Sequence, residues 1–183
     1  VRDAIGDLPP IKSGHSGWEE IDYPEKENYQ NEYVAMLSKE SSKIFNHQVH
    51  VPEETVRARF KYIDRGSGLK DIWEKNKISE ELILNTYSPE TRKKIHTNIY
   101  RRLEWDEPSW TITHVRKAVL LHPDKRQGRL LSVREAARIQ SFMDWYRFHG
   151  SLTQQYQQVA DAVPPLLAKQ IAVHIAPFLQ ASA

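Results

Sequence analysis

The sequence predicts an α+β fold, and three observations support this prediction. The 183 residues are 39% hydrophobic and 27% charged, a balance typical of soluble globular domains. Apolar residues at helical spacing indicate helices in the first and last thirds of the chain. The runs Trp-Thr-Ile-Thr at 110–113 and Ala-Val-Leu-Leu at 118–121 are strand-like. The mean hydropathy is −0.66, and no apolar run approaches the roughly 20 residues that cross a bilayer.

Cysteine content and charge distribution narrow the possible functions. The chain contains no cysteine, which excludes disulfides, thiolate metal sites and a cysteine nucleophile carried by this chain. The net charge is +2, but residues 1–56 contain 5 basic and 11 acidic residues, whereas the remainder contains 21 and 13. The basic excess is densest from Arg57 to Arg102, with 12 basic against 6 acidic residues. Clustered Lys and Arg suit a polyanion such as nucleic acid, although a solvated basic surface has the same composition.

The first third of the chain predicts irregular structure followed by a helix. Residues 1–30 contain many Pro, Gly and acidic residues, which indicates turns rather than a continuous element. A helix is predicted over 32–41, with apolar residues on one side at Tyr33, Val34, Met36 and Leu37. The run 49–63 is ambiguous, because its β-branched and aromatic residues favour a strand while 53–57 also suits the start of a helix.

The middle of the chain predicts loops and short elements. The sequence Arg-Gly-Ser-Gly at 65–68 indicates a loop. Ser88 followed by Pro89 is typical of a helix start, so a short helix is predicted to about Ile99. The strand-like runs at 110–113 and 118–121 are followed by a predicted turn, His-Pro-Asp, at 122–124.

The last third contains the strongest helix signals. Ser132 and Glu135 fit a capping box, which predicts a helix over 133–142. A second helix is predicted over 166–176, ended by Pro177. This second helix is apolar nearly all round, so it needs burial on more than one side. In a chain this short, that pattern predicts a partner surface for Leu167, Ile171 and Ile175.

Several other patterns carry little functional information. His47 and His50 have a spacing that metal ligands use, but a metal site needs three or four ligands and no metal site is predicted. The basic clusters Arg57-x-Arg59 and 92–94 are compatible with either a solvated helix face or phosphate contacts. Gly66-x-Gly68 lacks the further residues of a phosphate-binding loop.

Two segments near the C-terminus closely resemble a known family. The sequences RLLSVREAARIQSFMD at 129–144 and QVADAVPPLLA at 158–168 match, in order and spacing, the last two sequence motifs of the DNA (cytosine-5) methyltransferases. The stretch 100–113 resembles the end of that family's target recognition domain, including the Thr111-Ile112 dipeptide. Residues 1–9 are similar to the segment that leads into that domain.

The resemblance implies a domain organisation. Residues 1–13 would lead from the catalytic domain into a DNA-binding target recognition domain at 14–128, followed by the helix of the penultimate motif at 129–150. Residues 151–183 would form the final-motif helix, which packs on the catalytic domain. The α+β fold would then comprise a small mixed recognition domain and a helical segment that completes a Rossmann-like methyltransferase domain.

The implied function is DNA recognition within a larger enzyme. Members of the family transfer a methyl group from S-adenosylmethionine to carbon 5 of a cytosine flipped out of duplex DNA. The nucleophilic cysteine and most of the cofactor site would belong to an N-terminal catalytic part, so this chain alone is expected to be inactive and to hold no catalytic residue. Its expected partners are double-stranded DNA and that catalytic part, in a cytoplasmic, bacterial, nucleoid-associated setting without a membrane. Two alternatives remain open: a stand-alone specificity subunit of a two-chain methyltransferase, and a decayed DNA-binding module without activity.

The resemblance assigns roles to individual positions. The penultimate motif, which organises the recognition domain against the catalytic domain, includes Arg134, Glu135 and Arg138. The final motif, beside the methionine end of the cofactor, includes Asp161, Ala162 and Val163. The expected DNA contacts are the dipeptide near the flipped nucleotide and the basic residues around it, namely Arg101, Arg102, Thr111, Ile112, His114 and Arg116.

Two positions depart from the family pattern. Ala160-Asp161 stands where the family usually has Gly-Asn, and Met143 stands where it usually has Pro. A carboxylate at position 161 would repel the carboxylate of the cofactor unless the side chain turned away or a neighbouring base offset its charge.

Overall fold

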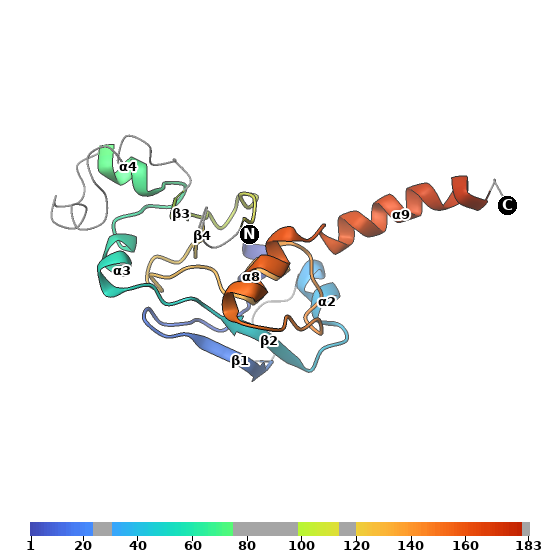
Figure 1. Ribbon diagram of the computed structural model, residues 1–183, viewed down its shortest axis with the longest axis horizontal. Helices are drawn as coiled ribbons and strands as arrows, with labels where there is room; N and C mark the ends of the chain where they lie inside the picture. The colour runs from blue at the N-terminus through green and yellow to red at the C-terminus, as the bar shows by residue number, and fades with distance from the viewer. Residues whose placement is uncertain (24–30, 75–98, 114–119, 181–183) are drawn as a thin grey trace.

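The computed structural model of the chain describes residues 1–23, 31–74, 99–113 and 120–180. Helices and short strands are mixed along these ranges, as expected for the α+β class. Figure 1 shows a body formed by most of these elements and one long C-terminal helix that extends away from it.

An antiparallel pair of strands forms one side of the body (Figure 1). β1 (Gly17–Asp22) pairs with β2 (Lys43–Gln48) so that Gly17 lies opposite Gln48. The prediction of irregular chain over 1–30 is therefore wrong for β1, and also for the short helix α1 (Arg2–Ile5). The sequence of β1 is Gly-Trp-Glu-Glu-Ile-Asp, and its strand conformation depends on pairing with a distant segment, which local sequence does not encode.

The helix predicted over 32–41 is confirmed as α2 (Glu32–Ser38), which lies between β1 and β2 in the chain. Asn31 caps it, because its side-chain oxygen accepts a hydrogen bond of 2.8 Å from the backbone amide of Val34. The cap explains why the helix begins at the predicted position.

The next segment is helical rather than extended. The ambiguous run 49–63 contains α3 (Glu54–Phe60), so its helix interpretation is confirmed. The loop predicted at 65–68 is also confirmed, and α4 (Leu69–Glu74) follows it. The helix predicted from position 88 lies outside the described residues, apart from its last residue.

A second, very short pair of strands is parallel. β3 (Arg101–Arg102) pairs with β4 (Leu120–Leu121), so the strand predicted at 118–121 is confirmed for its second half, and the first half lies outside the described residues. The strand predicted at 110–113 is wrong. In place of pairing, Ile112 packs against two hydrophobic clusters of the body, which holds this stretch as irregular chain.

α7 (Val133–Ile139) begins with the predicted capping box. The hydroxyl of Ser132 accepts a hydrogen bond of 3.1 Å from the Glu135 amide, and the Glu135 carboxylate accepts one of 2.7 Å from the Ser132 amide. The helix ends before the predicted residue 142, because the chain turns into the left-handed region at Ser141, where φ is +64°.

α8 (Leu152–Asp161) lies within the single final-motif helix that the resemblance implies over 151–183, but the structure has two helices there, α8 and a second one over Pro165–Gln180. α8 also begins with a capping box, formed by Ser151 and Gln154, and it packs on α7. Its apolar residues are few, so hydrophobic periodicity gave no clear signal, whereas the capping residues identify its start.

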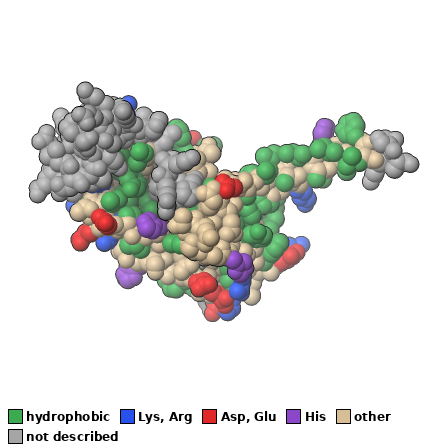
Figure 2. Space-filling model, in the orientation of Figure 1, with side chains coloured by type: hydrophobic (Ala, Val, Ile, Leu, Met, Phe, Trp, Pro, Cys, Tyr) green, Lys and Arg blue, Asp and Glu red, His purple; other side chains and the backbone are tan. Residues whose placement is uncertain are grey.

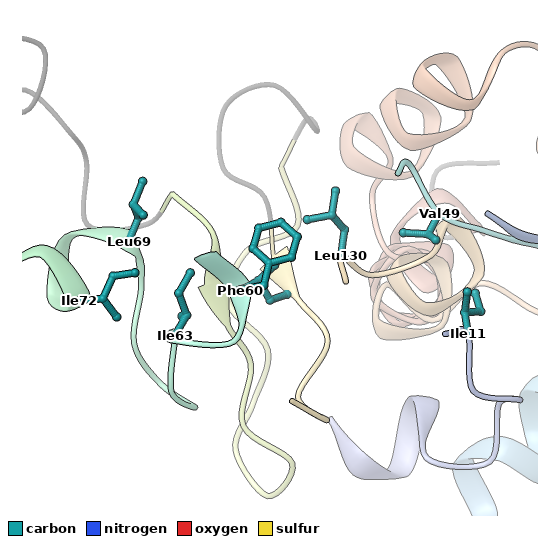
Figure 3. Close-up of a cluster of buried hydrophobic side chains, with 8 residues drawn as sticks. Ile11, Val49, Phe60, Ile63, Leu69, Ile72 and Leu130 are labelled. Carbon is teal, nitrogen blue, oxygen red and sulfur yellow. The ribbon is translucent and has the colours of Figure 1, made fainter. Parts of the chain in front are cut away.

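Three clusters of buried hydrophobic side chains fill the body. The first, shown in Figure 3, lies around α3 and α4 and comprises Ile11, Val49, Phe60, Ile63, Leu69, Ile72, Leu121 and Leu130. The second joins α1 to both strand pairs and comprises Ala4, Ile5, Leu8, Ile44, Leu103, Leu120 and Leu131. The third lies between α7 and α8 and comprises Val133, Ala136, Ala137, Phe142, Phe148, Tyr156 and Val159. The first two clusters join segments that are far apart in sequence.

α9 (Pro165–Gln180) projects from the body, and hydrophobic side chains lie along its exposed surface (Figures 1 and 2). The residues predicted to need a partner surface are 52%, 47% and 45% exposed, at Leu167, Ile171 and Ile175 respectively. The prediction that Pro177 ends the helix is wrong, because Pro177 lies inside α9. Proline cannot donate to the carbonyl four residues earlier, but on an exposed helix that carbonyl remains open to water.

One stretch satisfies a simple criterion for a membrane span, in contrast to the sequence prediction. Leu152–Leu179 is long and apolar enough by length and composition, with a window hydropathy of 1.3. However, the stretch comprises α8 and α9, which are separated where Ala162 adopts an extended conformation. α9 itself has 16 residues, fewer than the roughly 20 that a spanning helix needs.

Candidate nucleic-acid interface and its buried scaffold

Arg101, the first of two neighbouring arginines on β3, lies at the surface against an aromatic ring. Its guanidinium stacks over Trp110, with 3.8 Å between the guanidinium carbon and the ring centroid. The side chain is half-buried, and its Nε atom is buried without a hydrogen-bond partner among the described residues. Trp110 itself is 46% exposed. Arg101 therefore remains a candidate DNA contact.

Arg102, its neighbour, is completely buried, which corrects the prediction that it contacts DNA. Successive side chains on a strand point to opposite sides, so Arg101 and Arg102 enter different environments. The Arg102 guanidinium donates hydrogen bonds to three backbone carbonyls, those of Phe60 at 2.7 Å, Ile63 at 2.8 Å and His122 at 2.5 Å. Burial lowers the pKa of Arg102 to about 10, which keeps the side chain charged at neutral pH. Its role in this structure is to tie β3 to the segments after α3 and β4.

Thr111 and Ile112 line a cleft of about 510 Å³ beside Trp110. Ile112 is half-buried and anchors the dipeptide to the body, whereas Thr111 is exposed. The other walls of the cleft come from α1, α2, the end of α7 and the loop before Trp110, at Val1, Asp3, Ala4, Tyr33, Ser109, Ile139 and Gln140. Thr111 and Trp110 thus share one surface. The other two predicted DNA contacts, His114 and Arg116, lie outside the described residues.

Arg134 of the penultimate motif is a buried structural arginine. It donates hydrogen bonds to the carbonyls of Phe45 at 2.7 Å and Met143 at 3.1 Å, and to that of Tyr146. Burial lowers its pKa to about 10, an effect that the charge of Asp144 partly offsets. Arg134 therefore links β2 to the chain that follows α7.

Arg138 forms a buried ion-pair cluster with two carboxylates. It donates two hydrogen bonds of 2.9 Å to Asp144 and one of 2.5 Å to Asp7, and it also contacts the Tyr23 hydroxyl at 2.9 Å. Burial alone would lower the pKa of Arg138, but the charges of Asp144 and Asp7 raise it above its ordinary value. Burial raises the pKa of Tyr23, which stays protonated and also donates to Asp144. This cluster joins the N-terminal segment, β1 and the chain after α7.

Glu135 is the centre of a second buried cluster. Its carboxylate accepts two hydrogen bonds of 2.7 Å from Arg129, and His122 Nε2 lies 3.6 Å from the same group. Burial would raise the pKa of Glu135, but the charge and hydrogen bonds of Arg129 lower it below its ordinary value. Burial lowers the pKa of His122 to about 4, so the imidazole is neutral at pH 7. Through these two clusters, the Arg/Glu-rich helix α7 joins distant segments of the described chain.

His47 is also part of the scaffold rather than a metal ligand. Both ring nitrogens are occupied, because Nε2 donates to the Pro9 carbonyl at 2.7 Å and Nδ1 lies 2.9 Å from the Ser132 hydroxyl. Burial lowers the pKa of His47 and favours its neutral form. No group of three or more metal-ligating side chains occurs among the described residues.

Of the two basic clusters that the sequence left ambiguous, only Arg57-x-Arg59 can be compared with the structure. Arg59 of the pair Arg57-x-Arg59 is buried, so it is not part of a solvated helix face. Arg57 donates to the Pro52 carbonyl at 3.0 Å. The other basic cluster, at 92–94, lies outside the described residues.

The three positions of the final motif lie at the junction of α8 and α9. Asp161 and Val163 are exposed, and Ala162 is half-buried in an extended conformation. The Asp161 carboxylate accepts a hydrogen bond of 2.5 Å from Gln157, one turn earlier on α8, which directs it along the helix. A ligand could contact the exposed side chains of Asp161 and Val163. The Asp161 carboxylate is hydrogen-bonded to the neutral side-chain amide of Gln157.

Sequence reasoning missed two kinds of residue in this region. Trp110 belongs to the candidate interface, but no helical or strand periodicity connects it to Arg101. His122, Arg129 and Tyr23 belong to the buried clusters, and only the three-dimensional structure brings them to α7. A signal was present for Arg129, which lies three residues before the start of the capping box and six residues from Glu135.

Comparisons with known proteins agree on one family. The sequence profile described as "C-5 cytosine-specific DNA methylase" matches residues 7–176. The type II methyltransferase M.DdeI of Desulfomicrobium norvegicum is 33% identical to the chain over 183 residues, covering 96% of the chain and 42% of that protein. Mouse DNA (cytosine-5)-methyltransferase 1 is 46% identical over 90 residues, covering 46% of the chain and 5% of that protein.

A solved structure shows a similar fold. It is described as a DNA modification methyltransferase encoded within a prophage in E. coli, and it has a TM-score of 0.65 with 19% sequence identity. The similarity covers 98% of the chain and 47% of that structure. The chain therefore spans less than half the length of each of these three proteins.

Proposed function

The chain belongs to the C-5 cytosine-specific DNA methylase family, and from that premise we propose that it forms the C-terminal, DNA-recognising part of a DNA (cytosine-5) methyltransferase. In this proposal the chain binds duplex DNA and specifies the sequence around the target cytosine. An N-terminal catalytic part supplies the nucleophilic cysteine, which this chain does not contain. The chain alone therefore transfers no methyl group.

The observation that supports this proposal most is that apolar side chains are buried in the body but exposed on α9. The body has its own core and its own buried ion pairs, whereas α9 exposes a continuous run of large apolar side chains. A helix that is apolar nearly all round is stable in water only when other surfaces cover it. We assign that cover to the catalytic part, so that residues 151–183 complete its domain and residues 14–128 form the recognition domain.

The surface of the recognition domain supports a DNA-binding role. Arg101 is partly accessible and stacks on Trp110, and Trp110 and the exposed Thr111 line the cleft of about 510 Å³. Guanidinium and hydroxyl groups are the donors that proteins use most often on DNA. Arg101, Thr111 and Ile112 therefore remain proposed DNA-contacting positions, with Ile112 acting as an anchor, and His114 and Arg116 remain proposed from the sequence.

S-adenosylmethionine is the methyl donor that the family implies. Asp161, Ala162 and Val163 would border one side of such a site only with the Asp161 carboxylate turned along α8, as its hydrogen bond from Gln157 directs it, because the neutral amide does not offset its charge. We propose that these residues border the methionine end of the donor, while the catalytic part holds the rest. The bound donor would supply the methyl group, and this chain's residues would only limit its position.

The test measures DNA binding and methyl transfer separately. The purified 183-residue chain is titrated against duplex DNA at several salt concentrations, and radiolabelled methyl transfer is measured with and without a separately expressed N-terminal catalytic part. We expect salt-sensitive DNA binding, no transfer by the chain alone, and sequence-specific transfer by the mixture. Transfer by the chain alone, or no DNA binding at any salt concentration, would overturn the proposal. DNA binding without any restored transfer would instead indicate a module that has lost its enzymatic role.

A further inference from the structure

We propose that Trp110 is a positioning residue that holds the Arg101 guanidinium against a backbone phosphate of duplex DNA. The inference rests on the proposed DNA-recognition function and adds a residue and a type of contact to it. Trp110 touches Arg101 directly, with 3.8 Å between the ring centroid and the guanidinium carbon.

The first argument is that Arg101 has unused hydrogen-bond donors. Four buried arginines have several partners within the protein: Arg102 and Arg134 donate to three carbonyls each, and Arg129 and Arg138 donate to buried carboxylates. Exposed arginines are also engaged, as shown by the ion pairs of Arg2, Arg126 and Arg147. For Arg101, no hydrogen bond or ion pair is seen within the described ranges, only the stack on Trp110.

The second argument is the orientation of the guanidinium. Its Nε atom is the buried one, so the terminal Nη groups form its accessible end. The ring of Trp110, 3.8 Å away, fixes the plane of the guanidinium and reduces the side-chain freedom that binding would otherwise remove. A planar pair of N–H donors matches two phosphate oxygens.

The third argument favours phosphate over a base edge. A half-buried arginine lying flat on an aromatic ring cannot extend far from the protein surface, and phosphates are the outermost groups of the duplex, whereas base edges lie within the grooves. Thr111 is exposed next to Trp110 and offers a hydroxyl donor on the same surface. A guanidinium and a hydroxyl together form a donor set typical of a backbone contact.

The experiment compares Trp110→Ala, Trp110→Phe, Arg101→Ala and the double variant Arg101→Ala/Trp110→Ala in the 183-residue chain, using fluorescence anisotropy with duplex DNA at several salt concentrations. We expect Trp110→Ala to weaken binding about 3- to 30-fold, the range of a cation–π contact, while Trp110→Phe retains most of the affinity. Arg101→Ala should reduce the slope of log affinity against log salt by about 1. The double variant should bind like Arg101→Ala, because Trp110 acts through Arg101.

The matched control is Trp145→Ala, which removes another exposed tryptophan, one that packs against Tyr146 rather than a cation. It should leave DNA affinity unchanged. Urea unfolding of each variant separates a loss of folding from a loss of positioning. Wild-type affinity for Trp110→Ala, additive effects in the double variant, or lost sequence discrimination with an unchanged salt slope would each overturn the inference. By contrast, failure of the wild-type chain to bind duplex DNA would overturn the proposed function itself.

Discussion

Asp144 accepts two hydrogen bonds of 2.9 Å from the guanidinium of Arg138, and both side chains are completely buried. The pair lies where three distant segments meet, because Arg138 also bonds to Asp7 of the N-terminal segment and to Tyr23 after β1. A buried ion pair adds little net stability over apolar packing, but it requires both partners. Its role here is to fix how these segments assemble around α7.

Asp144→Ala should therefore destabilise the chain by about 3–5 kcal/mol, because it leaves the charge of Arg138 buried with only Asp7 as a close carboxylate partner. Urea denaturation measures the change. The control is Asp106→Ala, which removes the carboxylate of an exposed pair with Arg2 and should change the free energy of unfolding little. Equal effects of the two substitutions would show that the buried pair has no special role.

Acidification should destabilise the fold through His122. Burial lowers its pKa from the ordinary 6.5 to about 4, so between these values the unfolded chain binds a proton that the folded chain does not. Stability therefore falls as the pH drops from about 6.5 to 4, by up to about 3 kcal/mol for this residue. His122→Asn, whose side-chain oxygen can accept the hydrogen bond that the Asp124 amide donates to His122 Nδ1, should flatten this dependence in thermal melts over that range. If stability depended on pH equally in the variant and the wild type, the assignment to His122 would be wrong. His47 contributes in the same direction, but it is present in both proteins and does not affect the comparison.

Two helices were predictable from sequence, α2 from its apolar spacing and α7 from its capping box. The capping box of Ser132 and Glu135 places the start of α7, and the helix over 32–41 appears as α2, because both depend on neighbouring residues. β1 was not predictable, because its conformation depends on pairing with a strand that begins more than twenty residues later. The prediction that Pro177 ends α9 was wrong, because the effect of a proline on a helix depends on whether the carbonyl four residues earlier is exposed to water.

The candidate site was predictable as a region but not residue by residue. Sequence placed Arg101 and Arg102 together as DNA contacts, yet strand alternation buries Arg102 and leaves Arg101 accessible. The penultimate motif named Arg138 and Glu135, but Tyr23 and His122, which contact them, come from distant segments. Burial and long-range pairing decide these roles, and neither is encoded in local spacing.

Arg101 and Arg102 give a direct comparison of a surface and a buried arginine. Arg102→Ala should destabilise the chain by about 3 kcal/mol or more, because three buried carbonyls lose their donor. Arg101→Ala should leave the free energy of unfolding nearly unchanged, because the side chain makes no hydrogen bond within the described ranges. Chemical denaturation of both variants tests this, and a stable Arg102→Ala protein would refute the structural role of Arg102.

Gly17, at the start of β1, should not tolerate a side chain. Its φ is +77°, and an added Cβ would overlap the carbonyl oxygen of His47 on the paired strand and lie 2.7 Å from Ile11 Cδ1. Gly17→Ala should therefore cost at least about 2 kcal/mol, from backbone strain and displacement of β2. Gly128→Ala is the control, because φ there is +51° but the nearest atom would be 3.5 Å away. Thermal melts should show a clearly larger decrease for Gly17→Ala than for Gly128→Ala.

Replacing the apolar residues of α9 should separate folding of the body from assembly with the catalytic part. Leu167, Ile171 and Ile175 are about half exposed, so the triple Ser variant should fold with nearly the wild-type free energy of unfolding. If these side chains pack on the catalytic part, their loss should weaken binding to it by more than tenfold, since each buried aliphatic side chain contributes roughly 1.5–3 kcal/mol. Isothermal titration with the separately expressed catalytic part measures this. Lys169→Ala, an exposed change on the same helix, should have little effect, and wild-type affinity of the triple variant would show that α9 is not the contact surface.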